Sequence, residues 1–264
     1  MEIMNIVNSN SELEKFIQFV ATKKNELQDW KFLHITAQGS LGDVKIGEVE
    51  QFLKFQIHTE NSWLLRMPDT NELLLFIHND GEFVLTQFEK SLHVNFGDDI
   101  LPTGSQGFEE NGLAGFSKII EPHIEEDNIP ARIAFTRMAR ADNNIMVLDD
   151  DPMVLKQMEK ILGDFGNVMT LKTVEDFEGK YVQHAPDIFF LDIHLDAAEG
   201  NKILKELQRN TDPYAHVIMI SSDTKENLVM DIKEGGAKGF VVKPTSRDNL
   251  HKHILRSPTM IVNS

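Results

Sequence analysis

The amino-acid sequence predicts an α/β protein, with a doubly wound, five-stranded parallel sheet in its C-terminal half and a smaller α+β domain before it. The first observation is that, from Asn144 onward, five short apolar runs alternate with five segments of helical periodicity over about 115 residues. The second is the order of elements before Asn144, which is one helix followed by β-α-β-β-α. The third is that two of the apolar runs end in carboxylates.

The first part of the chain, residues 1–126, predicts helices that back an antiparallel sheet. Ser11 and Glu14 resemble a capping box at the start of a helix over 12–28. A stretch at 68–71 has the composition of a hairpin turn. The other expected helices cover 44–55 and 82–96, and the expected strands cover 31–37, 62–67 and 72–77. A long loop is expected over 97–115, followed by a helix over 113–126 that Pro122 interrupts.

Residues 127–143 are the candidate connector between two domains. They carry Pro130 and three arginines, and they could themselves be helical, because Ile133, Phe135 and Met138 recur at helical spacing. The domains expected on either side are residues 1–126 and residues 144–258.

The C-terminal half repeats a strand followed by a helix. The expected strands cover 145–148, 167–171, 187–192, 216–220 and 239–242, and the expected helices cover 152–162, 174–183, 201–209, 225–234 and 246–255. The third strand is apolar until it ends in Asp192, and the first strand is followed by Asp149 and Asp150. Open α/β sheets bind ligands at the carboxyl ends of their strands, so these acids should converge if the two strands are neighbours.

Charge and composition narrow the class of function. The chain has a net charge of −16, with 12 basic and 23 acidic residues before Asn144. Neither half offers the basic surface that phosphate-backbone binding needs, and no helix-turn-helix is found, so DNA binding is disfavoured. Cysteine is absent, the N-terminus does not resemble a signal peptide, and no apolar stretch reaches the roughly 20 residues of a membrane span. A soluble cytoplasmic protein is therefore expected.

Five separated features stand out in the C-terminal half, over about 144–256. They are Asp149-Asp150 after the first strand, Asp192 after the third, Gly200 eight residues beyond it, Ser221 after the fourth, and Lys243-Pro244 after the fifth. Together they resemble the receiver domains of two-component response regulators. The resemblance implies the flavodoxin-like strand order 2-1-3-4-5, a cis peptide bond between Lys243 and Pro244, and a phosphoacceptor role for Asp192.

The resemblance also implies a bound Mg²⁺. Its direct ligands would be Asp150, Asp192 and the backbone carbonyl of His194, and Asp149 would contribute through water. The residue types suit this ion, because Mg²⁺ prefers oxygen ligands in octahedral geometry and retains several waters. A cation is also needed where clustered carboxylates meet an incoming phosphoryl group.

Three further residues would act on the phosphoryl group. Phosphoryl transfer needs an in-line nucleophile and positive charge on the equatorial oxygens. By resemblance the Ser221 hydroxyl and the Lys243 ammonium would each contact a phosphoryl oxygen. Phe240 would be the aromatic switch residue that turns inward when Ser221 engages the phosphate.

Each of these features also has an ordinary structural interpretation. Asp149, Asp150 and Asp151 could simply cap the following helix, and Ser221 could be a turn residue. Lys243 could be a solvated surface lysine and Phe240 a core residue. One departure from the family is Asp196, where a proline is usual. It adds negative charge beside the site and leaves the loop less constrained.

The expected function is that of a bacterial phosphorelay protein. Asp192 would receive a phosphoryl group from a sensor histidine kinase or a histidine phosphotransfer protein. The N-terminal domain would bind a further protein partner or form a homodimer, and the protein is not expected to be an enzyme.

An alternative function comes from residues 66–73, which faintly resemble the signature hairpin of diguanylate cyclases (GGDEF). The N-terminal half would then be a degenerate, receiver-controlled domain that binds or processes a nucleotide. Both glycines of that hairpin are missing, and no metal-binding acid follows the strand at 31–35.

Overall fold

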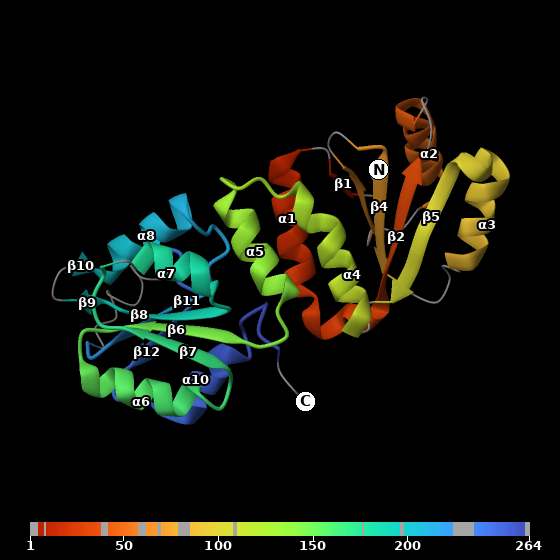
Figure 1. Ribbon diagram of the computed structural model, residues 1–264. Coiled ribbons are helices and arrows are strands. Elements are labelled where there is room, and N and C mark those ends of the chain that lie inside the picture. The colour runs from red at the N-terminus through yellow and green to blue at the C-terminus, as the bar shows by residue number, and fades with distance from the viewer. Residues whose placement is uncertain are drawn as a thin grey trace. The chain divides into compact units, whose positions relative to one another are not determined.

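The computed structural model describes residues 5–7, 9–37, 42–57, 62–67, 70–78, 85–107, 110–175, 177–195, 198–223 and 235–261. The chain divides into two compact units, Met1–Glu125 (unit 1) and Glu126–Ser264 (unit 2), and Figure 1 labels their elements. No helix in the described part of the chain is both long enough and apolar enough to cross a bilayer.

Unit 1 is an α+β domain built on a five-stranded sheet. Its elements are β1 (Asn5–Val7), α1 (Asn10–Thr22), β2 (Trp30–Ala37), α2 (Gly42–Gln56), β3 (Ser62–Arg66), β4 (Glu72–His78), α3 (Leu85–Phe96), β5 (Ile100–Gly107) and α4 (Glu110–Ile120), with 3-10 helices η1 (Lys24–Asp29), η2 (Gly97–Asp99) and η3 (Glu121–His123). The strand order is β1-β3-β4-β2-β5, in which only the β1–β3 pair is parallel. The succession β2-α2-β3-β4-α3-β5 is a ferredoxin-like βαββαβ fold with one added edge strand.

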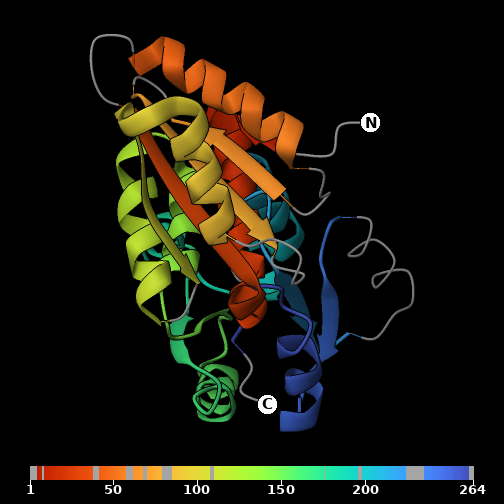
Figure 2. The same ribbon diagram turned by 90° about the vertical axis from the view of Figure 1, so that its right-hand side faces the viewer.

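Helices cover both faces of this sheet because side chains alternate along each strand. Leu33 and Ile35 of β2 pack with Val49 of α2 in an aliphatic cluster, and Figure 2 shows α2 and α3 in front of the sheet. The opposite face is aromatic: the ring of Phe76 lies 5.6 Å from that of Phe16 in α1 and 6.0 Å from that of Phe116 in α4. The predicted α+β fold is confirmed.

Two strands of unit 1 were not predicted. Residues 97–115 were expected to form a loop, which is wrong, because they contain β5, paired with β2 along the edge of the sheet. Such an edge strand is defined by backbone hydrogen bonds to one neighbour and needs no apolar alternation. The three-residue β1 is too short to show a period. The helix expected over 12–28 ends at Thr22 and continues as the 3-10 helix η1. The turn residues Pro68 and Asp69 lie outside the described part.

Unit 2 contains the predicted doubly wound sheet. Its elements are α5 (Ile129–Ala139), β6 (Asn144–Leu148), α6 (Pro152–Leu162), β7 (Asn167–Leu171), α7 (Phe177–His184), β8 (Ile188–Asp192), β9 (His194–Leu195), β10 (Ala198–Glu199), α8 (Gly200–Asn210), β11 (Val217–Ser221), β12 (Gly239–Val242) and α10 (Arg247–Ile254). The parallel strands lie in the order β7-β6-β8-β11-β12, which is the predicted order 2-1-3-4-5. The helix expected over 225–234 lies outside the described residues, as does Asp196.

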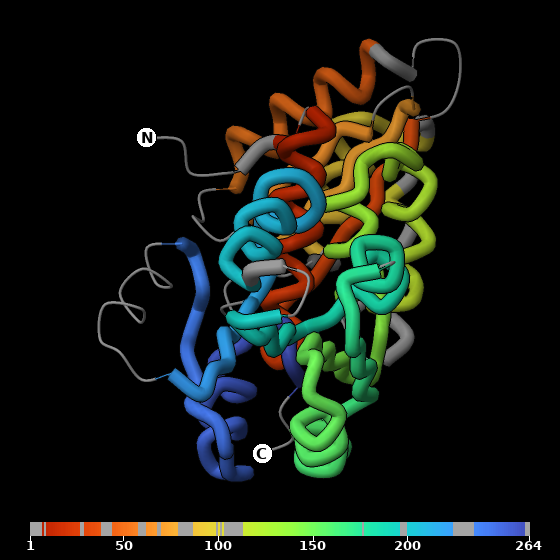
Figure 3. Tube along the Cα trace, turned by 90° about the vertical axis from the view of Figure 1, so that its left-hand side faces the viewer, coloured from red at the N-terminus to blue at the C-terminus, as the bar shows by residue number. Residues whose placement is uncertain are grey.

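The sheet of unit 2 is buried on both faces, as the apolar runs predicted. Helices α6 and α10 pack on one face in a cluster that includes Val147, Phe190 and Ile220, and they lie together below the sheet in Figures 1 and 3. Helices α7 and α8 pack on the other face. The same cluster contains Ile133 of α5, so this helix, which occupies most of the segment 127–143, is a part of unit 2.

Candidate functional site

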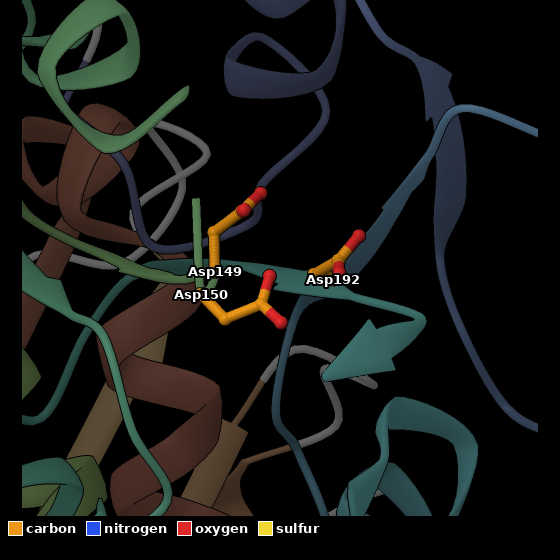
Figure 4. Close-up of side chains that lie close together, drawn as sticks. All are labelled: Asp149, Asp150 and Asp192. Carbon is orange, nitrogen blue, oxygen red and sulfur yellow. The ribbon is translucent and has the colours of Figure 1, made fainter. Parts of the chain in front are cut away.

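Three carboxylates converge at the carboxyl end of the parallel sheet. Asp149 directly follows β6 and Asp192 is the last residue of β8, and the two strands are hydrogen-bonded neighbours. Asp149, Asp150 and Asp192 each offer a carboxylate oxygen within 4.8 Å of the others, and Figure 4 shows the three side chains gathered together. The predicted convergence of these acids is confirmed, and its cause is the adjacency of the two strands.

Lys243 supplies a cation at the centre of the cluster. Its Nζ lies 2.6 Å from Oδ2 of Asp149 and donates a hydrogen bond of 2.8 Å to Oδ1 of Asp192. Its side chain is only 16% exposed, so a purely solvated surface lysine is ruled out. Burial by itself lowers the pKa of Lys243, but the hydrogen bonds and charges of Asp149 and Asp192 outweigh it and raise the pKa, so the ammonium form is kept.

The cluster holds more negative charge than Lys243 neutralises. The described residues bring three carboxylates together, and two of them, Asp149 and Asp192, are buried and share the ammonium of Lys243. Burial raises the pKa of Asp149, while Lys243 and a backbone N–H oppose that rise. Burying like charges together is unfavourable, so the site is electrostatically suited to a further cation.

Asp151, and not Asp149, caps helix α6. The Asp151 carboxylate accepts a hydrogen bond of 2.8 Å from the backbone N–H of Met153, with Pro152 at the first helical position. Asp149 instead accepts the backbone N–H of Asp151 at 3.0 Å and turns its other oxygen to Lys243. Asp149 and Asp151 therefore have different contacts, which the local sequence pattern could not distinguish.

Gly200 lies against the backbone of Asp192. A Cβ at this position would lie 2.1 Å from the carbonyl oxygen of Asp192, which is far inside any allowed contact. Helix α8 begins at Gly200, whose N–H donates a hydrogen bond of 2.8 Å to the carbonyl of Ile193. Glycine is therefore required here so that the chain can fold back onto the end of β8.

Ser221 and Phe240 belong to the neighbouring strands. Ser221 is buried and ends β11, one residue beyond the register partner of Asp192. Its hydroxyl oxygen accepts a hydrogen bond of 3.0 Å from the N–H of Asp223, and its carbonyl accepts the N–H of Lys243. Phe240 is half-buried against the core. The expected cis bond between Lys243 and Pro244 is present.

His194 is the first residue of β9, and its side chain is exposed. Its imidazole is not part of the cluster that Asp149, Asp150 and Asp192 form among the described residues. A metal-binding role for the backbone carbonyl of His194 stays a prediction.

A cavity of about 280 Å³ borders the site and was not expected from the sequence. Its walls come from α6, from β11 and β12, and from the segment after β12, and they include Met158, Lys243 and Pro244. These residues are far apart in the chain and show no shared pattern, so only the fold brings them together.

The family model for the response regulator receiver domain matches residues 145–255. The chemotaxis protein CheY of Bacillus subtilis is 29% identical over 110 residues, which are 41% of this chain and 91% of that protein. CheY of Listeria monocytogenes is 32% identical over 108 residues, covering 40% of this chain and 90% of that protein. The crystal structure of the CheX–CheY–BeF3–Mg complex from Borrelia burgdorferi is 34% identical and covers 43% of this chain and 87% of that chain, with a TM-score of 0.40.

The sequence match and the structure concern the same residues. The matched region spans all five strands of the parallel sheet, the acidic cluster and Lys243. By its unit 2, this chain belongs to the family of response regulator receiver domains of two-component signalling.

Proposed function

We propose that this protein is a two-component response regulator whose Asp192 is phosphorylated in a Mg²⁺-dependent reaction. The observation that carries the proposal is the position of Lys243, whose ammonium bridges Asp149 and Asp192 beside a third carboxylate. A site with this balance of charge suits the transfer of an anionic phosphoryl group.

The residues present fit a magnesium ion. Carboxylate oxygens are hard ligands, and the ammonium that Asp149 and Asp192 share carries less charge than these two carboxylates, so that a divalent cation can balance the rest. Asp150 and Asp192 would hold the ion directly with the carbonyl of His194, and Asp149 would hold it through water. When bound, the ion neutralises charge on the phosphoryl oxygens.

The nucleophile is a carboxylate oxygen of Asp192. It attacks the phosphorus of a phosphohistidine on the donor protein, so that a phosphorus–oxygen bond forms while the phosphorus–nitrogen bond breaks. Lys243, already hydrogen-bonded to Asp192, moves its hydrogen bond to a phosphoryl oxygen. The Ser221 hydroxyl binds another phosphoryl oxygen, and Phe240 turns inward as it does so.

The donor would be a sensor histidine kinase or a histidine phosphotransfer protein in the cytoplasm. We further propose that unit 1 is not an enzyme, and that it binds a protein partner or a second copy of itself. Protein contacts are favoured over DNA because the chain carries 42 acidic residues against 26 basic ones.

The test is phosphorylation by the small-molecule donor acetyl phosphate with Mg²⁺, followed by intact-mass analysis. One added phosphoryl group is expected, and none with Asp192→Asn or after chelation of the metal. Asp248→Asn, an exposed acid at the start of α10, is the matched control and should be phosphorylated normally. A wild-type protein that gains no phosphate, or an Asp192→Asn variant that still does, refutes the proposal.

A second candidate is the nucleotide-binding or nucleotide-processing function. The βαββαβ order of unit 1 is compatible with the hairpin resemblance over 66–73. Calorimetry and turnover assays with GTP and with cyclic di-GMP decide this question. Absence of both binding and product rejects this candidate, and a measurable product rejects the proposal that unit 1 is not an enzyme.

A further inference from the structure

Helix α5 is bound to the rest of unit 2 through a buried arginine. The side chain of Arg137 is 2% exposed, although arginine is rarely buried unless it is paired. Its guanidinium donates to Oδ2 of Asp212 at 2.6 Å and to the hydroxyl of Tyr181 at 3.1 Å. Its Nε donates to the carbonyl of Pro186 at 2.9 Å, and Tyr181 itself donates to Asp212 at 2.7 Å. One side chain thus joins α7, the segment just before β8 and the loop between α8 and β11.

A second arginine extends the same contact by three residues. Arg140 donates to Oδ2 of Asp187 at 2.6 Å and to the carbonyl of Ala185 at 3.0 Å. The same oxygen of Asp187 accepts the backbone N–H of Asn144 at 2.8 Å. Together with Ile133 in the core, these contacts make a built interface of specific hydrogen bonds and apolar packing.

The segments that α5 contacts lead into the strands that carry the phosphorylation site. Asp187 directly precedes β8, which ends at Asp192, and Asn144 begins β6, which ends beside Asp149. Asp212 lies in the loop before β11, which ends at Ser221. Each of these strands is five residues long, or about 17 Å, and is packed on both faces. The strands therefore connect the two ends of the sheet as short, stiff elements.

We propose that the face formed by α7, the segment just before β8 and the α8–β11 loop is the output surface of this receiver, and that its partner is helix α5 of the same chain. Occupation of the Asp192 site changes the strength of the hydrogen bonds and ion pairs by which Arg137 and Arg140 attach α5 to this surface. The change passes to unit 1, because only residues 124–128 separate η3 from α5. This inference rests on the proposed function, since it names where the phosphorylation signal leaves the receiver.

The chemistry of the contact favours a switch over a purely structural role. A buried ion pair usually stabilises a fold no better than apolar residues of the same volume, and its best-attested use is to specify one arrangement. The pair here is matched in charge and geometry, because a guanidinium fork meets a carboxylate, a hydroxyl and a carbonyl. If a ligand bound at Asp192 alters the affinity of the output surface for α5, then bound α5 alters the affinity of the Asp192 site for that ligand by the same factor.

The experiment is hydrogen–deuterium exchange of the full chain with and without beryllofluoride in the presence of Mg²⁺. Beryllofluoride mimics a phosphoryl group on the carboxylate of Asp192. Two regions are followed: the backbone amides of residues 129–139, and those of residues 192–200 beside the site. We expect protection at 192–200 and a change of at least about fivefold in the exchange of 129–139. Asp192→Asn should abolish both effects.

Tyr181→Phe, which removes one hydroxyl of the contact, should reduce the effect at 129–139 and preserve the protection at 192–200. Arg132→Ala is the matched control, because Arg132 lies on α5 but is exposed, and within the described part of the chain its side chain donates to the carbonyl of Glu126 and to no residue of the output surface. It should leave both effects unchanged. If Tyr181→Phe does not fold, the comparison of wild type with Asp192→Asn decides alone.

The outcomes separate the two proposals. Protection at 192–200 with unchanged exchange at 129–139 overturns the inference, makes α5 a static part of the fold, and leaves the proposed function intact. Absence of protection at 192–200, together with failure of acetyl phosphate to modify the protein, overturns the proposed function. A loss of the effect at 129–139 in Arg132→Ala also counts against the inference, because that residue does not touch the output surface.

Discussion

Replacing Arg137 by methionine should destabilise unit 2 by about 3–5 kcal/mol, because it leaves the carboxylate of Asp212 buried without its cation. Asp212 is 1% exposed, and among the described residues its carboxylate would retain two neutral partners, the hydroxyl of Tyr181 and the backbone N–H of Tyr214. Burial by itself lowers the pKa of Arg137, but Asp212 and Tyr181 outweigh it and raise that pKa, so the arginine is charged at every relevant pH. The loss in free energy of unfolding should be smaller when the unpaired carboxylate of Asp212 is removed as well.

The assay is urea unfolding of wild type, Arg137→Met, Asp212→Asn and the double variant. Both tryptophans, Trp30 and Trp63, lie in unit 1, so the transition of unit 2 must be followed by circular dichroism or tyrosine signals. The double variant should be at least about 2 kcal/mol more stable than the sum of the single effects predicts. Strict additivity, or a cost below about 1 kcal/mol for Arg137→Met, would refute the reasoning.

Three other variants test the site and its surroundings. Gly200→Ala should slow the phosphorylation of Asp192 measured by mass analysis, because the new Cβ collides with the Asp192 carbonyl, whereas Gly179→Ala, with nothing within 4 Å, should not. Lys243→Met should slow phosphorylation by a factor on the order of 100 and leave Mg²⁺ binding, followed by calorimetry, equal or tighter, since one competing cation is gone. Burial lowers the pKa of His216 from 6.5 to about 4, so stability is full above pH 6.5 and is lost as the pH falls toward 4. His216→Gln should remove up to about 3 kcal/mol of that loss in urea unfolding, and an unchanged pH profile would contradict the assignment.

Much of the site could be predicted because it is local to strand ends. An apolar run fixes a strand that is buried on both faces, and the residue after it then lies at the edge of the sheet where parallel strands deliver their side chains together. Asp149, Asp192 and Ser221 follow from this rule. The spacing of Gly200 and Lys243 from them identified the family, and the fold then brought Lys243 to within 2.8 Å of Asp192.

Unit 1 was harder to predict in detail. Periodicity and turn chemistry predict its helices and its hairpin, but they predict a loop where the structure has β5. An edge strand takes its structure from the backbone of a neighbour, here β2, and its side chains need not alternate in character. The partner or nucleotide that unit 1 binds stays a prediction, because neither the faint hairpin resemblance nor the βαββαβ order specifies a ligand.

The sequence by itself determined which segments form the parallel sheet and which acids end its strands, because both properties depend on neighbouring residues in the chain. The tertiary structure alone decided that Asp151 caps α6 while Asp149 binds Lys243. It alone paired Arg137 with Asp212, which lies 75 residues away. Contacts of this kind leave no local pattern, since a buried charge is tolerable only where the fold supplies its partner.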